Sequence, residues 1–130
     1  MTIPFWCLVV VIFLPFAPTV LSIRHRVEQF GEYDNNFSRA QGAALTGKGA
    51  LVWAAHQNAL EQRAPFAAAV IVAHVSGADQ SASAMLALGF VGLRLLHLIA
   101  HLNEYAGLRS ALFGASMACV LGQFILAAMA

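Results

Sequence analysis

Long stretches without charge alternate with short polar segments along this chain. Residues 1–23 and 110–130 contain no charged side chain, and each is about as long as the ~20 residues that an α-helix needs to cross a bilayer core. Two further apolar stretches, roughly 49–78 and 81–103, hold a few ionisable groups. The pattern predicts an all-α membrane protein built as a four-transmembrane-helix bundle. The expected helices cover roughly 3–21, 47–77, 81–104 and 108–129.

The composition supports a membrane location for the whole chain. Of the 130 residues, 60% are hydrophobic and 10% are charged, whereas soluble domains usually carry about 25% charged residues. The expected helices leave no room for a soluble domain, so residues 1–130 are expected to form a single membrane domain in contact with lipid. The formal net charge is +1 and no basic cluster is present. We therefore expect no nucleic-acid partner.

The first apolar stretch is expected to remain in the membrane as an anchor. It lacks a positively charged start, exceeds the roughly 7–15 apolar residues of a signal peptide, and precedes Arg24-His25-Arg26 directly. Pro15 and Pro18 are expected to kink its last turns or to end the helix early. The polar residues 22–46 are then expected to form the longest loop.

The distribution of basic residues predicts the orientation. The first loop holds Arg24, Arg26, Arg39 and Lys48, which are four of the 7 Lys and Arg residues, and Arg109 borders the third loop. The second loop holds no basic residue. Because basic loops tend to stay in the cytoplasm, the first and third loops are expected there, with both termini outside.

Polar and ionisable residues recur at helical spacing inside the expected second and third helices. Asn58 and Glu61 are three residues apart, so they share one helix face. Arg94, His97 and His101 follow one another at spacings of three and four and share a face of the next helix. Charged groups inside membranes are rare and usually functional. These residues are therefore candidates for a binding site.

The polar faces of the expected second and third helices lie at similar depths in the membrane. Glu61 lies about fourteen residues, or roughly 21 Å, from the cytoplasmic start of its helix, and Arg94 lies roughly 15 Å from the cytoplasmic end of the next. Their side chains are expected within salt-bridge reach, in the same or in adjacent subunits. Arg109, at the start of the fourth helix, is expected at the cytoplasmic mouth.

This combination of side chains suits a small zwitterionic peptide. Arginine binds carboxylates through a planar fork, and a carboxylate beside an amide binds an ammonium group. A guanidinium near a thiol also favours the thiolate. The alternative is a buried polar network that only fixes the register of the helices. Polar groups on the second helix must be hidden from lipid, which favours a homo-oligomer.

Two features fall outside this set. The His97–His101 pair lacks an obvious third ligand, so no metal site is predicted. Arg63 lies two residues beyond Glu61, nearly opposite it on the helix and near mid-membrane. The sequence suggests no partner for Arg63.

Three motifs resemble those of the MAPEG family, the membrane-associated proteins in eicosanoid and glutathione metabolism. Asn58-x-x-Glu61, followed by Pro65-Phe66, resembles the family's second-helix motif. Arg94-x-x-His97-x-x-x-His101 looks like its third-helix pattern, and Leu108-Arg109-Ser110 resembles its fourth-helix motif. The segment Tyr33-Asp34-Asn35 looks like the first loop of short bacterial members. The motifs follow the family's order across about residues 30–115.

The resemblance implies a homotrimer in the bacterial inner membrane that uses glutathione as a co-substrate. Glutathione would bind between neighbouring subunits near the cytoplasmic side. Arg109 matches the arginine taken to activate the glutathione thiol. The residues expected to hold glutathione match motif positions or stand beside them; they are Asn58, Glu61, Arg94, His97, His101 and Ser110.

Three positions depart from the pattern of the eukaryotic enzymes. Gln57 stands where those enzymes usually have an arginine, and His101 stands where they have a tyrosine. Phe113 occupies the position of an aromatic hydroxyl. Three potential glutathione contacts are therefore altered, and no specific eicosanoid activity is supported.

The predicted function is a glutathione-dependent membrane transferase or peroxidase that acts on small apolar electrophiles or lipid hydroperoxides. The alternative is a small four-helix transporter or a non-catalytic membrane binding protein. Short four-span exporters place their buried glutamate in the first span, which is uncharged here. A trimer that binds glutathione would favour the first reading, and a dimer that binds cations would favour a transporter.

Overall fold

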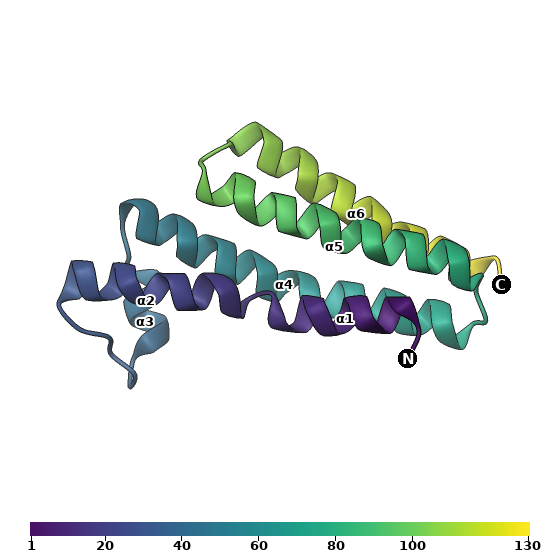
Figure 1. Cartoon of the computed structure of the whole chain (residues 1–130), viewed down its shortest axis with the longest axis horizontal. Coiled ribbons are helices and arrows are strands. Elements are labelled where there is room, and N and C mark those ends of the chain that lie inside the picture. Colours follow the sequence, from purple (N-terminus) through teal and green to yellow (C-terminus); the bar gives the residue numbers. More distant parts are fainter.

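The computed structural model describes residues 1–130 and shows a bundle of α-helices without β-strands (Figure 1). The helices are α1 (Ile3–Phe13), α2 (Phe16–Phe30), α3 (Ser38–Ala43), α4 (Gly47–Val75), α5 (Gln80–Leu102) and α6 (Ala106–Ala128). Helices α1 and α2 follow each other end to end as one rod. Helix α4 lies antiparallel beside this rod, and the α5–α6 hairpin covers both (Figure 1). Because α4 contacts every other helix, it forms the centre of the bundle.

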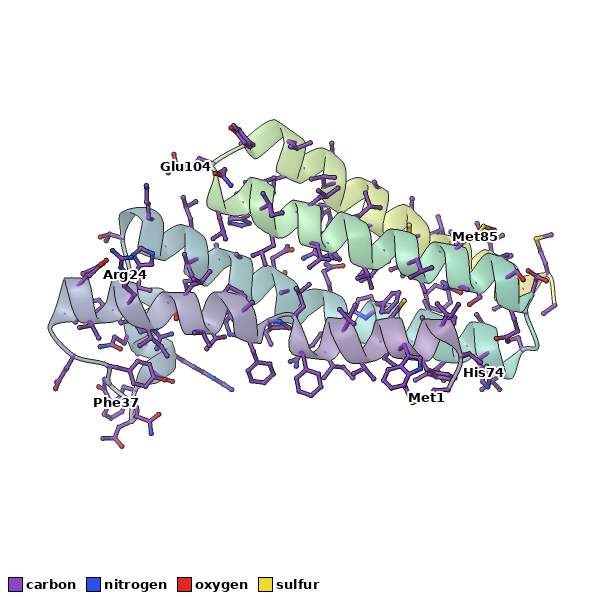
Figure 2. All side chains as sticks on the ribbon, viewed as in Figure 1. Met1, Arg24, Phe37, His74, Met85 and Glu104 are labelled. Carbon is purple, nitrogen blue, oxygen red and sulfur yellow. The ribbon has the colours of Figure 1, made fainter.

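The two ends of the bundle differ in character. The N- and C-termini lie at one end, together with the turn between α4 and α5 (Figure 1). Met1 and Met85 mark this end, whereas Arg24 and Glu104 mark the opposite end, which also carries α3 (Figure 2). The charged first loop and the α5–α6 turn therefore share one end of the molecule.

The first helix is longer than the sequence indicated, and this corrects one expectation. The helix breaks after Phe13, but α2 restarts at Phe16 and continues to Phe30, well past the expected end near residue 21. Pro15 immediately precedes α2 and Pro18 lies in its first turn. A proline in the first turn removes no intrahelical hydrogen bond, because those N–H groups lack partners there in any case. The prolines thus begin a new helix, and residues 22–30 are helical.

Three helical segments are long and apolar enough to cross a membrane. They are the combined α1–α2 rod (Ile3–Phe30), α5 and α6. Helix α4 has 29 residues, which exceeds the length needed, but it does not reach the same apolarity. Its middle carries Asn58, Glu61 and Arg63. A fourth crossing by α4 therefore stays a prediction.

The apolar core lies toward the end of the bundle that carries the termini. Phe66 of α4 and Phe90 of α5 are fully buried, and their rings stack with centroids 4.1 Å apart. Cys7 and Val11 of α1 pack into the same cluster. This core fixes α1, α4, α5 and α6 against one another, and the buried polar residues Arg94, His97 and His101 lie outside it.

A buried arginine connects the first loop to α4. Arg26 of α2 is 2% exposed, and its guanidinium lies 5.2 Å from the Trp53 ring and 5.3 Å from the Tyr33 ring. Its Nη1 donates a hydrogen bond of 2.8 Å to the Ser38 carbonyl. Cation–π contacts and this bond together hold α3 and Trp53 in place.

Gly42 of α3 packs so closely on this cluster that a methyl group there is expected to displace Trp53. A Cβ atom on Gly42 would lie 2.6 Å from Trp53 Cε3 and 2.8 Å from Arg26 Nη2. Overpacking of this kind costs about 1–3 kcal/mol. Gly42→Ala should therefore lower the thermal midpoint and shift Trp53 emission, measured in a Trp6→Phe background. Gly92→Ala, where a Cβ meets nothing within 4 Å, is the control. Unchanged emission in Gly42→Ala would contradict this packing.

Candidate functional site

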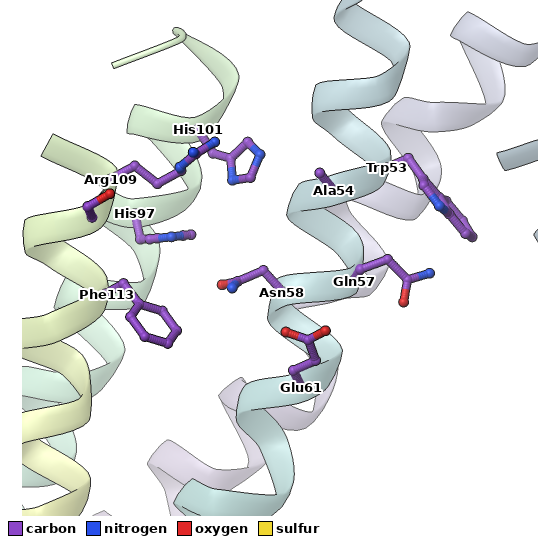
Figure 3. A pocket seen from close by; sticks show the side chains of 10 residues that line it. Trp53, Ala54, Gln57, Asn58, Glu61, His97, His101, Arg109 and Phe113 are labelled. Carbon is purple, nitrogen blue, oxygen red and sulfur yellow. The ribbon is translucent and has the colours of Figure 1, made fainter. Parts of the chain in front are cut away.

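A groove of about 650 Å³ separates α4 from the α5–α6 hairpin. Figure 3 shows Asn58 extending from α4 toward His97 and Phe113 on the facing helices. The α4 residues that line the groove are Trp53, Ala54, Gln57, Asn58 and Glu61. The residues contributed by α5 and α6 are His97, His101, Arg109, Ser110 and Phe113. All of the site residues expected from the sequence line this groove except Arg94.

Helical spacing explains how the expected residues come together. Asn58 and Glu61, three apart on α4, face the hairpin, and His97 and His101, four apart on α5, face α4 (Figure 3). Arg109 lies in the first turns of α6, which begins at Ala106. The α5–α6 turn therefore brings Arg109 to the level of the two histidines.

Arg94 lies behind the groove and not on its surface. It is 2% exposed, and its Nη2 donates a hydrogen bond to Oδ1 of Asn58. The expected salt bridge between Arg94 and Glu61 does not form within the chain, because the salt bridges present both involve Glu28. Glu61 is instead exposed in the groove. Pairing with Glu61 of an adjacent subunit stays a prediction.

Several buried nitrogen atoms beside the groove lack a hydrogen-bond partner. They are Nε and Nη1 of Arg94 and both ring nitrogens of His101. The His97 ring centroid lies 5.7 Å from that of His101 and 6.5 Å from that of Phe113. An unsatisfied buried polar group costs about 1–3 kcal/mol, and more when it is charged. An oxygen acceptor on a ligand would satisfy the N–H of the His101 ring, which lines the groove.

The groove carries charge of both signs. Glu61 is its carboxylate and Arg109 its guanidinium. A second recess of about 490 Å³ continues from it past His101 and Arg109 to Lys48 and Glu104, at the charged end of the bundle. The Ser110 hydroxyl, in contrast, donates to the Ala106 carbonyl within α6. The arrangement is thus an open, mixed-charge groove that leads to the polar end.

Comparison with known protein families decides which family the chain belongs to. The model of the MAPEG family matches residues 3–129. The chain belongs to the MAPEG family. Comparisons with curated proteins and with solved structures gave no match. As a MAPEG protein it is a membrane protein of a family associated with glutathione, which confirms the family expected from the three motifs.

The structure adds two groove residues that the sequence analysis of this MAPEG protein did not select. Trp53 and Ala54 line the α4 wall. The sequence contained a signal for Trp53, because Trp53, Gln57 and Glu61 follow one another at intervals of four and therefore share a helix face. Gln57 and Phe113 entered the sequence analysis only as departures from the family pattern, yet both line the groove. The two positions are therefore part of the wall that determines what fits.

Proposed function

We propose that this MAPEG protein is a glutathione-dependent membrane transferase or peroxidase. The observation that supports this is the groove itself, in which Glu61, Arg109 and His101 come together from three helices. Glutathione carries two carboxylates, one ammonium group and a thiol. The groove offers a carboxylate and an amide for the ammonium group, and the unpartnered imidazole of His101 is a candidate to bind a carboxylate.

Six residues in or behind the groove have a role in this proposal. Glu61 and Asn58 hold the ammonium group of glutathione, and the imidazoles of His97 and His101 line the space beside it. Arg94 acts through Asn58, because its hydrogen bond fixes the orientation of that amide. Arg109, near the mouth, stabilises the thiolate. A nearby guanidinium favours the charged thiolate, so the pKa of the bound thiol should fall below about 8.5.

The chemistry needs a nucleophile that is positioned and activated. In transfer, the thiolate sulfur attacks an electrophilic carbon, a C–S bond forms and the leaving group departs with the bonding electrons. With a hydroperoxide, the sulfur attacks an oxygen, the O–O bond breaks and the alcohol leaves. A second glutathione then reduces the sulfur–oxygen product to give glutathione disulfide and water. The second substrate is apolar and arrives from the bilayer.

The assembly belongs to the same proposal. Helix α4 is the fourth membrane crossing, its polar face covered by α5 and α6 and by neighbouring subunits of a homotrimer. The first loop and the α5–α6 turn face the cytoplasm, with both termini outside, in a bacterial inner membrane. Support comes from the side-by-side arrangement of the α1–α2 rod, α4, α5 and α6 (Figure 1) and from the basic first loop.

Glu61→Ala should weaken glutathione binding more than it slows the chemical step. The carboxylate would hold the ammonium group, and a hydrogen bond to a charged group contributes about 1.5–3 kcal/mol, or about tenfold or more in affinity. Titration calorimetry with glutathione on the purified protein measures this change. Glu32→Ala, in the first loop outside the groove, is the matched control. A wild-type protein that gives no binding heat would remove the proposal and favour a transporter or a binding protein for other ligands.

A further inference from the structure

A separate recess of about 470 Å³ lies on another side of α4, between this helix, the start of α2 and α3. Figure 3 shows Trp53 and Gln57 extending to this side of α4, away from the α5–α6 hairpin. The polar residues that line the recess are Thr19, Arg39, His56, Gln57 and Arg63. The His56 ring is held in place, because its Nδ1 lies 2.8 Å from Thr19 Oγ1 and 3.0 Å from the Pro15 carbonyl oxygen.

The recess has positive charge without a compensating carboxylate. Arg39 and Arg63 both line it, and no Asp or Glu does. The salt bridges within the chain involve only Arg24 and His25 with Glu28, so neither guanidinium is paired. Arg63 lies roughly 24 Å along α4 from its start at Gly47, counting 1.5 Å per residue. The inference rests here on the proposed membrane crossing by α4: an unpaired cation at that depth would be costly, which indicates an anionic partner.

An apolar groove continues directly from this recess. It has a volume of about 340 Å³ and is lined by Ile12, Leu60, Arg63, Ala64 and Ala67. Leu60 and Arg63 belong to both hollows. The α4 residues recur at helical spacing, so the groove follows one face of α4 for roughly 10 Å. The continuous hollow is thus cationic at one end and apolar at the other.

We propose that this hollow binds an anionic phospholipid. The phosphate lies between Arg39 and Arg63, and an acyl chain lies along the groove past Leu60, Ala64 and Ala67. A guanidinium binds phosphate oxygens through two parallel hydrogen bonds, and Arg39 of α3 and Arg63 of α4 line the same recess. A free anion would use the recess but not the apolar groove. Glutathione does not match the hollow, which has no carboxylate for its ammonium group.

The test compares lipids with identical acyl chains on the full-length protein in detergent. Phosphatidylglycerol should raise the thermal midpoint and remain bound in native mass spectrometry, whereas phosphatidylcholine should do neither. Arg39→Gln and Arg63→Gln should each weaken phosphatidylglycerol binding by about tenfold or more. Arg24→Gln is the control, because that guanidinium is exposed, pairs with Glu28 and lies outside the hollow.

Other outcomes would overturn the proposal. Equal binding of both lipids would show that charge does not select the ligand. Stabilisation by inorganic phosphate alone, to the same extent as by phosphatidylglycerol, would assign the recess to a free anion. Loss of the oligomer in Arg63→Gln, with no lipid preference in the wild type, would identify a carboxylate of a neighbouring copy as the partner. If Arg63→Gln does not fold, the Arg39→Gln variant tests the proposal, because the Arg39 side chain is exposed. No readout involves glutathione, so the result is independent of the proposed activity.

Discussion

Replacing Arg109 by alanine should slow glutathione conjugation by about 10²-fold while changing glutathione affinity much less. Removing one group that stabilises charge in the transition state typically lowers the rate by about 10²–10³-fold. Arg109 is half-buried at the mouth of the groove, where its guanidinium would favour the thiolate over the thiol. The measurements are thiolate absorbance of bound glutathione at neutral pH, calorimetric affinity and the rate of conjugation to an apolar electrophile.

Two further variants separate the role of charge from a merely structural role. Arg109→Lys keeps the positive charge and should retain part of the thiolate signal, because a cation remains near the sulfur. Arg24→Ala removes an exposed guanidinium that does not line the groove and should leave the signal intact. If Arg109→Ala shows the same thiolate absorbance as the wild type, another group activates the thiol.

Phe66→Ala should be the most destabilising single truncation considered in the bundle. The Phe66 ring is fully buried and stacks on Phe90 at 4.1 Å with an interplanar angle of 8°. Truncation of a buried phenylalanine typically costs about 3–5 kcal/mol, because packing contacts disappear and a cavity remains. The expected result is a large fall in the thermal midpoint in detergent, together with loss of assembled protein.

Phe37→Ala provides the comparison for this experiment. Phe37 is 70% exposed and extends from the charged end of the bundle (Figure 2). Its truncation should change the thermal midpoint little, because surface substitutions usually stay within about 0.5 kcal/mol. Equal losses in the two variants would mean that the Phe66–Phe90 stack does not hold α4 to α5.

Much of the helical architecture was visible in the sequence because charge is sparse and its positions are informative. The expected ranges 81–104 and 108–129 compare with α5 at Gln80–Leu102 and α6 at Ala106–Ala128. Long uncharged runs and small turns mark these helices without any tertiary information. The first rod was harder, because proline breaks a helix interior but is tolerated in a first turn. Sequence alone did not distinguish these two positions for Pro18.

The groove residues were predictable for a different reason. Spacings of three and four place side chains on one helix face, so Asn58 with Glu61 and His97 with His101 could be paired from the sequence. The hydrogen-bond partner of Arg94 could not be predicted in this way. Depth along two helices matched Arg94 to Glu61, but the actual partner, Asn58, depends on rotation of each helix about its axis. That rotation is set by packing across the bundle, which a single-helix pattern does not contain.

Trp53 and Gln57 form a partition common to the mixed-charge groove and the cationic recess. A ligand that binds in one hollow and restricts these two side chains would reduce the conformational entropy that they lose when a second ligand binds in the other hollow. Thermodynamic linkage makes such an effect reciprocal, so each ligand would change the other's affinity by the same factor. Phospholipid from the surrounding bilayer would then act as a permanently available effector that changes the affinity of the protein for glutathione.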